Sequence, residues 1–329
     1  MPIDWEPLRQ ILENHQTFIL TSHVRPDADA LGSELGMAAI LEAMGKTVNI
    51  VNPSASPHNL LFLDPDKRVK KVGADFPSSK MLEADVHIIL DTSAWGQLGP
   101  VADILKKTKA IKVVIDHHVS SDDLGAIEFK DTKAAAAGEL VCRMAEELGY
   151  AIPPIAATPL YCAMATDTGW FRFPATSNRT MKAAGHLIEM GAKPHELYET
   201  LYENYSHARI LLAGKVLSRV KVECDGQIAY TTVSQEDFKQ TGANSVDTED
   251  LVNESLKIAG TQAAFIAIEQ QGRKNVKISL RSRLGFNVAT VAEQFGGGGH
   301  QQASGAMLPG PLEKAAQNIL NKLSEQLKD

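Results

Sequence analysis

The pattern of apolar and polar positions over residues 1–193 predicts strands that alternate with helices. Short apolar, β-branched runs predict buried strands, and apolar residues spaced three and four positions apart predict helices. This alternation is typical of an α/β domain with a doubly wound parallel sheet. The predicted strands are residues 17–22, 47–51, 86–90 and 113–115, and the predicted helices are residues 5–14, 28–44, 132–148, 154–166 and 177–190.

The pattern changes after this first domain. Residues 194–218 stay helical and rather polar, which predicts a helical connector. Residues 219–329 predict a second, smaller α/β domain with a mixed sheet, so we expect a domain at 1–193, a connector at 194–218 and a domain at 219–329. The predicted strands of the second domain are residues 220–223, 227–233, 263–269 and 275–281, and its predicted helices are residues 234–240, 248–259, 287–295 and 312–327.

Composition narrows the class of protein. The 329 residues are 44% hydrophobic and 22% charged, as in a soluble globular protein. The three cysteines are far apart and form no C-x-x-C pair, which predicts a reducing compartment. We find no signal peptide and no run of eighteen apolar residues, and we expect a cytoplasmic protein without a membrane anchor.

The formal net charge of -7 argues against binding long duplex nucleic acid, which requires a broad basic surface. The net charge does not exclude a small anionic substrate, because such a substrate needs only a local positive site and metal ions can supply it.

Acidic and imidazole side chains follow three of the predicted strands of the first domain. Carboxyl ends of parallel strands meet at one edge of a sheet, so these side chains should converge there. One aspartate after a strand is usually a turn or helix cap, but three strands that end in this way favour a shared site. The candidates are His23, Asp27, Asp29, Asp91, Asp116, His117 and His118, with Asp167 after a helix.

Such a cluster of carboxylates predicts bound metal. Crowded carboxylates repel one another unless a cation lies among them. Mixed histidine and carboxylate ligands suit manganese, magnesium, iron or zinc, and ligand type alone does not choose between them. The density of ligands around His23, Asp27 and Asp29 favours two ions, and two ions are suited to hydrolysis of a phosphate ester.

The motifs resemble those of the DHH phosphoesterase superfamily. They are SHVRPDADALGS at 22–33, DTS at 91–93, DHH at 116–118 and DTG at 167–169. The segment GGGGHQQASG at 296–305 resembles the glycine-rich signature of the companion DHHA1 domain. Together these motifs frame nearly the whole chain.

The resemblance implies two divalent ions, with Mn²⁺ preferred and Mg²⁺ possible, and catalytic roles for Asp91, Asp116 and His118. Asp91 would bridge the two ions, Asp116 would orient a histidine, and His118 would face the scissile phosphate. The alternative for His118 is a buried, hydrogen-bonded histidine of the core. The implied ligands are His23, Asp27 and Asp91 for one ion, and Asp29, Asp91, His117 and Asp167 for the other.

The resemblance is to the group of nanoRNases and pAp phosphatases. It implies short oligonucleotides and 3′-phosphoadenosine 5′-phosphate (pAp) as substrates. The charge and the hydropathy described above predict no long duplex nucleic acid and no membrane partner, and a homodimer is an open alternative to a monomer. A phosphodiesterase for cyclic or linear dinucleotides is the first alternative. A nucleotide-binding sensor without catalysis is a second alternative of another class.

Substrate binding is expected in the second domain. Consecutive glycines can bring backbone N–H groups against a phosphate or base; the alternative is a flexible turn, which the following His-x-x-Ala-Ser-Gly makes less favoured. Lys274 and Lys277 are expected to face solvent. The residues implied to bind substrate are Arg281, Gly297, Gly298, Gly299, His300 and Ser304.

The sequence departs from the pattern of the family at residues 134–137, which are all alanine and precede Gly138 and Glu139. Many relatives have Ser or Thr there, so a side-chain hydroxyl near the site is missing, which affects the expected substrate preference rather than the metal ligands.

Overall fold

The computed structural model describes residues 3–272 and 274–327. It divides into two compact units, and the division falls between Glu203 and Asn204. Each unit contains its own six-stranded sheet and its own buried cores. Among the described residues, no helix is both long enough and apolar enough to cross a bilayer.

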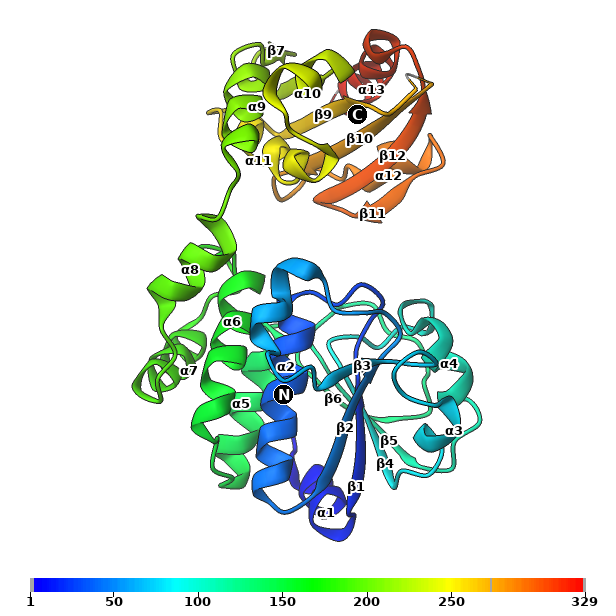
Figure 1. The fold of residues 1–329 in the computed structure, drawn as a ribbon, viewed down its shortest axis with the longest axis vertical. Helices are drawn as coiled ribbons and strands as arrows, with labels where there is room; N and C mark the ends of the chain where they lie inside the picture. Colours follow the sequence, from blue (N-terminus) through cyan, green and yellow to red (C-terminus); the bar gives the residue numbers. More distant parts are fainter. Residues whose placement is uncertain (1–2, 273, 328–329) are drawn as a thin grey trace. The chain divides into compact units, whose positions relative to one another are not determined.

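The first unit contains an entirely parallel sheet with the strand order β3-β2-β1-β4-β5-β6 (Figure 1). The predicted doubly wound parallel sheet is therefore confirmed. Two strands were not predicted, β3 and β6, because they are short and each contains charged residues. The strands are β1 (Thr17–Thr21), β2 (Thr47–Asn52), β3 (Val69–Lys71), β4 (Val86–Leu90), β5 (Ile111–Asp116) and β6 (Ile127–Lys130).

Helices cover both faces of this sheet. Leu20 and Ile88 pack with helices α1, α2, α5 and α6, whereas Ile19 and Ile89 pack with α3 and α4. Successive strand residues point to opposite faces, so each strand contributes to both cores. The helices are α1 (Glu6–Asn14), α2 (Ala28–Ala43), α3 (Ser78–Met81), α4 (Gly99–Leu105), α5 (Ala137–Leu148), α6 (Ala157–Asp167), α7 (Asn178–Glu189) and α8 (Pro194–Tyr202), with 3₁₀ turns at His58–Leu63, Trp95–Gln97 and Pro154–Ala156.

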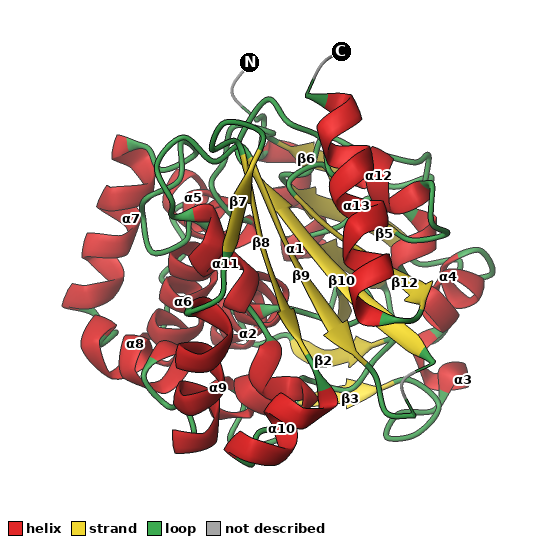
Figure 2. Ribbon diagram, turned by 90° about the horizontal axis from the view of Figure 1, so that it is seen from above, coloured by secondary structure: helices red, strands yellow, loops and turns green. Residues whose placement is uncertain are grey.

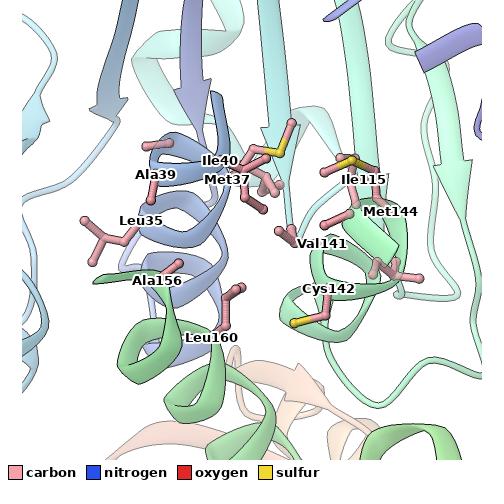
Figure 3. Packing of buried hydrophobic residues seen from close by; sticks show 14 of the residues in the cluster. Leu35, Met37, Ala39, Ile40, Ile115, Val141, Cys142, Met144, Ala156 and Leu160 are labelled. Carbon is pink, nitrogen blue, oxygen red and sulfur yellow. The ribbon is translucent and has the colours of Figure 1, made fainter. Parts of the chain in front are cut away.

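Helices α2 and α6 approach each other closely because α2 has glycines on the facing side. A Cβ atom on Gly32 would lie 2.3 Å from the carbonyl oxygen of Pro159, and one on Gly36 would lie 2.4 Å from Leu160 Cδ2. Helices α2, α5 and α6 contribute side chains to one buried cluster (Figure 3). The close contact of α2 and α6 places the start of α2 near the end of α6.

The predicted helix at residues 132–148 is wrong at its start. Helix α5 begins only at Ala137, and Ala136 before it is extended, with φ −165° and ψ 157°. Alanine favours helix, but the extended segment leaves the first N–H groups of α5 free for a side chain of α2.

The second unit contains a mixed sheet with the strand order β11-β12-β10-β9-β8-β7, in which β8 and β9 are parallel and the other described pairs are antiparallel. Figure 2 shows strands β7, β8, β9, β10 and β12 of this sheet. Phe265 of β9 packs with α12 and α13 on one face, and Ile266 packs with α9 and α11 on the other. The predicted mixed α/β domain is confirmed. The strands are β7 (Lys221–Glu223), β8 (Ile228–Val233), β9 (Ala263–Glu269), β10 (Asn275–Ser282), β11 (Gly298–His300) and β12 (Ala303–Pro309).

Two of these strands, β11 and β12, were not among the predicted strands. Glycine is rare in strands because it has no side chain to pack, so the pattern did not predict them. The helices of the second unit are α9 (His207–Leu217), α10 (Gln235–Thr241), α11 (Leu251–Leu256), α12 (Ala289–Glu293) and α13 (Leu312–Gln326), with a 3₁₀ turn at Ser245–Thr248.

The stretch expected to form the connector contains two helices, α8 and α9. The helix is interrupted after Tyr202, and Ser206 starts α9 by accepting a hydrogen bond from the N–H of Arg209. The division between the units falls within this interruption, so α8 belongs to the first unit and α9 to the second.

Candidate metal centre

The first unit brings together side chains from the ends of three neighbouring strands. β1 leads to His23, β4 leads to Asp91, and β5 leads to His117. The strand order reverses between β1 and β4, which is the position where parallel sheets open a crevice at their carboxyl ends. The close approach of α2 and α6 adds Asp29 and Asp167 to the same place.

One group of possible ligands consists of His23, Asp27 and Asp91. His23 Nε2 lies 3.5 Å from Asp91 Oδ2 and 3.8 Å from Asp27 Oδ1. The Nδ1 atom of His23 is 2.9 Å from the carbonyl oxygen of Val24, so Nδ1 carries the proton and Nε2 is free to bind a metal. Asp27 also caps α2, accepting hydrogen bonds from the N–H groups of Asp29 and Ala30.

A second group consists of Asp29, His117 and Asp167. His117 Nε2 lies 3.6 Å from Asp29 Oδ2, 3.5 Å from Asp167 Oδ2 and 3.3 Å from Asp91 Oδ1. The Nδ1 atom of His117 faces the carbonyl oxygen of Ala134 at 3.2 Å, which again leaves Nε2 free. All six side chains predicted as ligands are therefore brought together in these two groups.

Asp91 lies between the two groups. Its Oδ2 faces His23 and its Oδ1 faces His117, as a carboxylate that bridges two ions would. Its side chain is 2% exposed, and among the described residues Oδ1 has no hydrogen-bond partner. A buried carboxylate oxygen without a donor is costly, and a cation would remove that cost. The backbone of Asp91 is also strained, with φ at 61°.

Asp29 is held by the backbone at the start of α5. The N–H groups of Ala137 and Gly138 donate to its two carboxylate oxygens at 2.7 and 2.9 Å, and Ser33 Oγ donates at 3.0 Å. The alanine run therefore contributes backbone donors where a side-chain hydroxyl was missing. Sequence reasoning missed these donors because every residue except proline has an N–H group.

Asp116 and His118 form a hydrogen-bonded pair beside the ligands. Asp116 is completely buried, and its Oδ1 accepts hydrogen bonds from His118 Nδ1 at 2.8 Å and from the His118 N–H at 3.1 Å. Its Oδ2 faces Ser93 Oγ at 2.6 Å and Lys130 Nζ at 3.3 Å. The side chain of His118 is 42% exposed, so it is not a buried histidine of the core.

Sequence reasoning missed Ser93 and Lys130. Ser93 belongs to the motif at 91–93, but no role was predicted for its side chain. Lys130 comes from β6, a strand that was not predicted. The Lys130 side chain is only 14% exposed and lies beside the buried carboxylate of Asp116. A lysine is rarely this buried without an acidic partner, so the available signal in the sequence was a positive charge that could pair with one of the aspartates.

The acidic groups of the site and its histidines shift one another's pKa values. Burial opposes the charged form of His23, but Asp27 and Asp91 outweigh it and raise its pKa to about 11. Burial also opposes the charge of His117, yet the nearby carboxylates raise its pKa to about 10. Burial, together with Asp91 and Asp167, raises the pKa of Asp29 well above its usual range. Without metal, protons thus partly neutralise this acidic cluster, and divalent cations would take their place.

The second unit contains the residues expected to bind substrate. Arg281 lies on β10 beside Ala303 of β12, and its guanidinium contacts Asp250 Oδ1 at 3.7 Å. Ser304 is 6% exposed and pairs with Gly299. The side chain of His300 lies outside what the structure describes.

The glycines of this segment are not an open loop. A Cβ on Gly297 would lie 2.1 Å from the carbonyl oxygen of Gly305, and one on Gly299, whose φ is 143°, would lie 2.5 Å from that of Ala303. Both glycines are thus required by close packing against β12. Gly296 and Gly298, in contrast, have open space where a Cβ would lie.

Comparisons with known proteins agree with this geometry. The model of the DHH family N-terminal domain matches residues 17–164, and the model of the DHHA1 domain matches residues 225–329. The bifunctional oligoribonuclease and PAP phosphatase NrnA of Thermus thermophilus is 29% identical over 99% of this chain and 96% of its own length. The protein of the same name from Bacillus subtilis is 28% identical over 89% of this chain and 90% of its own length.

A solved structure gives a further similarity. An exopolyphosphatase-related protein from Bacteroides fragilis superposes with a TM-score of 0.90 and 30% identity, covering 98% of this chain and 97% of that one. A manganese-bound RecJ exonuclease superposes with a TM-score of 0.52 at 15% identity, which shows a shared fold alone.

Proposed function

The chain belongs to the DHH/DHHA1 phosphoesterase family, and from that premise we propose that it hydrolyses short oligonucleotides to mononucleotides and removes phosphate from pAp. The observation that carries this proposal is Asp91, a buried carboxylate whose two oxygens face two separate groups of ligands. Relatives named as oligoribonucleases and PAP phosphatases, similar over nearly their whole length, support the choice of substrate.

The donor set fits two divalent metal ions, and we propose Mn²⁺. His23, Asp27 and Asp91 would hold one ion, and Asp29, Asp91, His117 and Asp167 would hold the other. When bound, such ions activate water as a nucleophile near neutral pH and neutralise charge on phosphoryl oxygens. The chain's own contribution is to fix its donor atoms: backbone groups orient His23, His117 and Asp29 before any ligand binds.

His118 is the proposed contact to the scissile phosphate. Its hydrogen bond with Asp116, opposed by burial, raises the pKa of His118 and so favours the cationic imidazole. Because Nδ1 donates to Asp116, the other nitrogen, Nε2, is free to donate to a phosphoryl oxygen. Asp116 in turn is fixed from its other side by Ser93 and Lys130. This arrangement orients a donor toward the substrate rather than supplying a nucleophile.

Short substrates agree with the charge of the chain. A net charge of -7 disfavours long nucleic acid, whereas local groups such as Arg281 can bind one phosphate or nucleotide. Arg281, Gly297, Gly298, Gly299, His300 and Ser304 stay the proposed substrate-binding residues of the second unit.

The test is an assay of the full chain with Mn²⁺. We expect conversion of a 5′-labelled dinucleotide to mononucleotides and release of phosphate from pAp. Asp91→Asn should abolish both activities and lower the number of bound Mn²⁺ ions, because it removes the shared ligand. Asp103→Asn is the matched control, since Asp103 is an exposed aspartate of α4 outside the site.

Other outcomes would redirect the proposal. Preferential turnover of cyclic di-AMP or pApA would make the protein a dinucleotide phosphodiesterase, and turnover of inorganic polyphosphate would point to the activity named for the Bacteroides fragilis relative. Tight nucleotide binding with no turnover of any substrate would indicate a sensor. Near-normal activity of Asp91→Asn would contradict the metal assignment.

A further inference from the structure

The segment that follows Asp167 has an unusual backbone. Gly169, Trp170 and Phe171 all have left-handed conformations, with φ values of 56°, 64° and 63°. Two consecutive bulky residues in this region are rare and cost free energy, so the surrounding structure must hold them there. Trp170 and Phe171 pack partly buried against Tyr161, at ring-centroid distances of 6.3 and 5.7 Å, which retains this conformation.

The strained turn directs the next two residues back toward the end of α6. The N–H groups of Arg172 and Phe173 both donate to the carbonyl oxygen of Thr168, at 3.1 and 3.0 Å. The Phe173 ring then lies against Gly169, where an added Cβ would be only 2.5 Å from its Cζ atom. Gly169 is two residues from Asp167, so their Cα atoms are at most about 7.6 Å apart. The Phe173 ring thus lies against the backbone that follows Asp167, one of the proposed ligands.

Phe173 does not join the core in this position. Its side chain is 46% exposed, unlike Trp170 and Phe171 before it. The guanidinium of Arg172 lies 5.3 Å from the centre of its ring, and Arg172 Nε donates to the carbonyl oxygen of Gly169 at 2.8 Å. No carboxylate pairs with Arg172 within the described part of the chain. A planar cation and an aromatic ring are therefore fixed together and exposed to solvent.

We propose that Arg172 and Phe173 form a platform on which a nucleobase of the ligand stacks while its phosphate reaches the metal centre. The inference rests on the proposed function, because it names a base-binding subsite for that same site. Nucleobases stack on aromatic rings and on guanidinium planes, and each stacked base tightens binding about 5- to 150-fold. All four bases have such a face, so the platform accepts any short sequence. The charge of Arg172 also attracts the anionic ligand without binding one fixed phosphate.

The test compares two ligands that differ only in the base. Calorimetry of the full chain with Mn²⁺ measures binding of AMP and of ribose 5-phosphate. The wild type should bind AMP about 10-fold more tightly or better, the ratio expected from one stacked base. Phe173→Leu should reduce this ratio to near one, and Phe173→Trp should restore it, because indole stacks at least as well as phenyl.

Tyr205→Leu is the matched control. Tyr205 is likewise 46% exposed and lies against an arginine, with Arg209 Cζ at 4.0 Å from its ring centre, but it belongs to the other unit. The ratio of affinities should stay unchanged in this variant. An unchanged ratio in Phe173→Leu would overturn the inference and leave the proposed hydrolysis intact. Suppose that Phe173→Leu loses the difference in affinity between AMP and ribose 5-phosphate, but the wild type hydrolyses none of the substrates. That result would support the platform and reject the proposed function.

Discussion

Glu34 of α2 is a carboxyl group that the fold should keep protonated at neutral pH, and replacing it with glutamine tests this. Its side chain is completely buried. Oε2 accepts a hydrogen bond from Asn52 Nδ2 at 2.8 Å, and Oε1 has no partner among the described residues. Asn52 Oδ1 in turn accepts from the N–H of Ser22 at 2.9 Å. Burial raises the pKa of Glu34 to about 8, against the smaller opposing effect of Asn52 and Ser22.

The sign of the pH dependence follows from this raised pKa. The folded state binds the Glu34 proton more tightly than the unfolded state, in which the pKa is 4.5. The contribution of Glu34 to stability is therefore fully present below about pH 4.5 and is lost as the pH rises through 8. The slope between these values is about 1.4 kcal/mol per pH unit, so about 3 kcal/mol is lost between pH 5.5 and 8.

Glu34→Gln keeps the shape and the acceptor oxygen but cannot ionise. The free energy of unfolding of the wild type should fall relative to that of Glu34→Gln by about 3 kcal/mol between pH 5.5 and 8. All three tryptophans, Trp5, Trp95 and Trp170, lie in the first unit, so tryptophan fluorescence during urea unfolding reports on that unit alone. Both proteins are measured in the presence of a chelator, so that no metal is bound. The metal ligands then titrate in the same way in both proteins, and their contribution cancels in the difference.

A parallel pH dependence in the two proteins would refute the argument, because it would mean that Glu34 is ionised at neutral pH. A large loss of stability in Glu34→Gln at every pH would point instead to the geometry of the hydrogen bond with Asn52.

Three further predictions concern packing, orientation and metal binding. Gly32→Ala should lower the free energy of unfolding of the first unit by about 1–3 kcal/mol, because the added Cβ would meet Pro159. Gly185→Ala should raise this free energy by about 0.5–1 kcal/mol, because Gly185 lies within α7 and has open space around it. Urea unfolding measures both changes. Asp116→Asn should lower kcat about 10–100-fold by releasing His118, with the Mn²⁺ stoichiometry unchanged in a metal-binding assay. Mn²⁺ should raise the melting temperature of the first unit, and Asp29→Asn should weaken that shift; an equal shift in this variant would contradict its assignment as a ligand.

Much of the fold follows from local patterns in the sequence. Helix α2 and strands β4 and β9 were predicted within one residue because each is a strongly apolar segment with a clear end, such as Gly45 after α2. The six side chains predicted as ligands were found together because each follows a strand or helix that the pattern identified. A parallel sheet then brings the ends of its strands to one edge.

The rest of the site depends on contacts that no local pattern shows. Lys130 comes from a strand too short to predict, and the backbone donors of α5 have no side-chain signature. Residues 169–173 look like an ordinary turn in the sequence, because the conformations of Trp170 and Phe171 are set by packing against Tyr161. The strand at Gly298–His300 forms because β12 is beside it, against the preference of its glycines.

The backbone hydrogen bonds to Asp29 determine which changes in the sequence this region can accept. Any residue except proline at position 137 keeps the N–H group that donates to Asp29, but the side chain of Ala137 is completely buried, so only small residues fit there. Position 138 is more restricted, because a Cβ there would lie 2.7 Å from that of Ala163. Inserting or deleting one residue before α5 would shift both N–H groups away from the carboxylate. Over evolution, both the length of this segment and the small size of its residues should therefore be preserved.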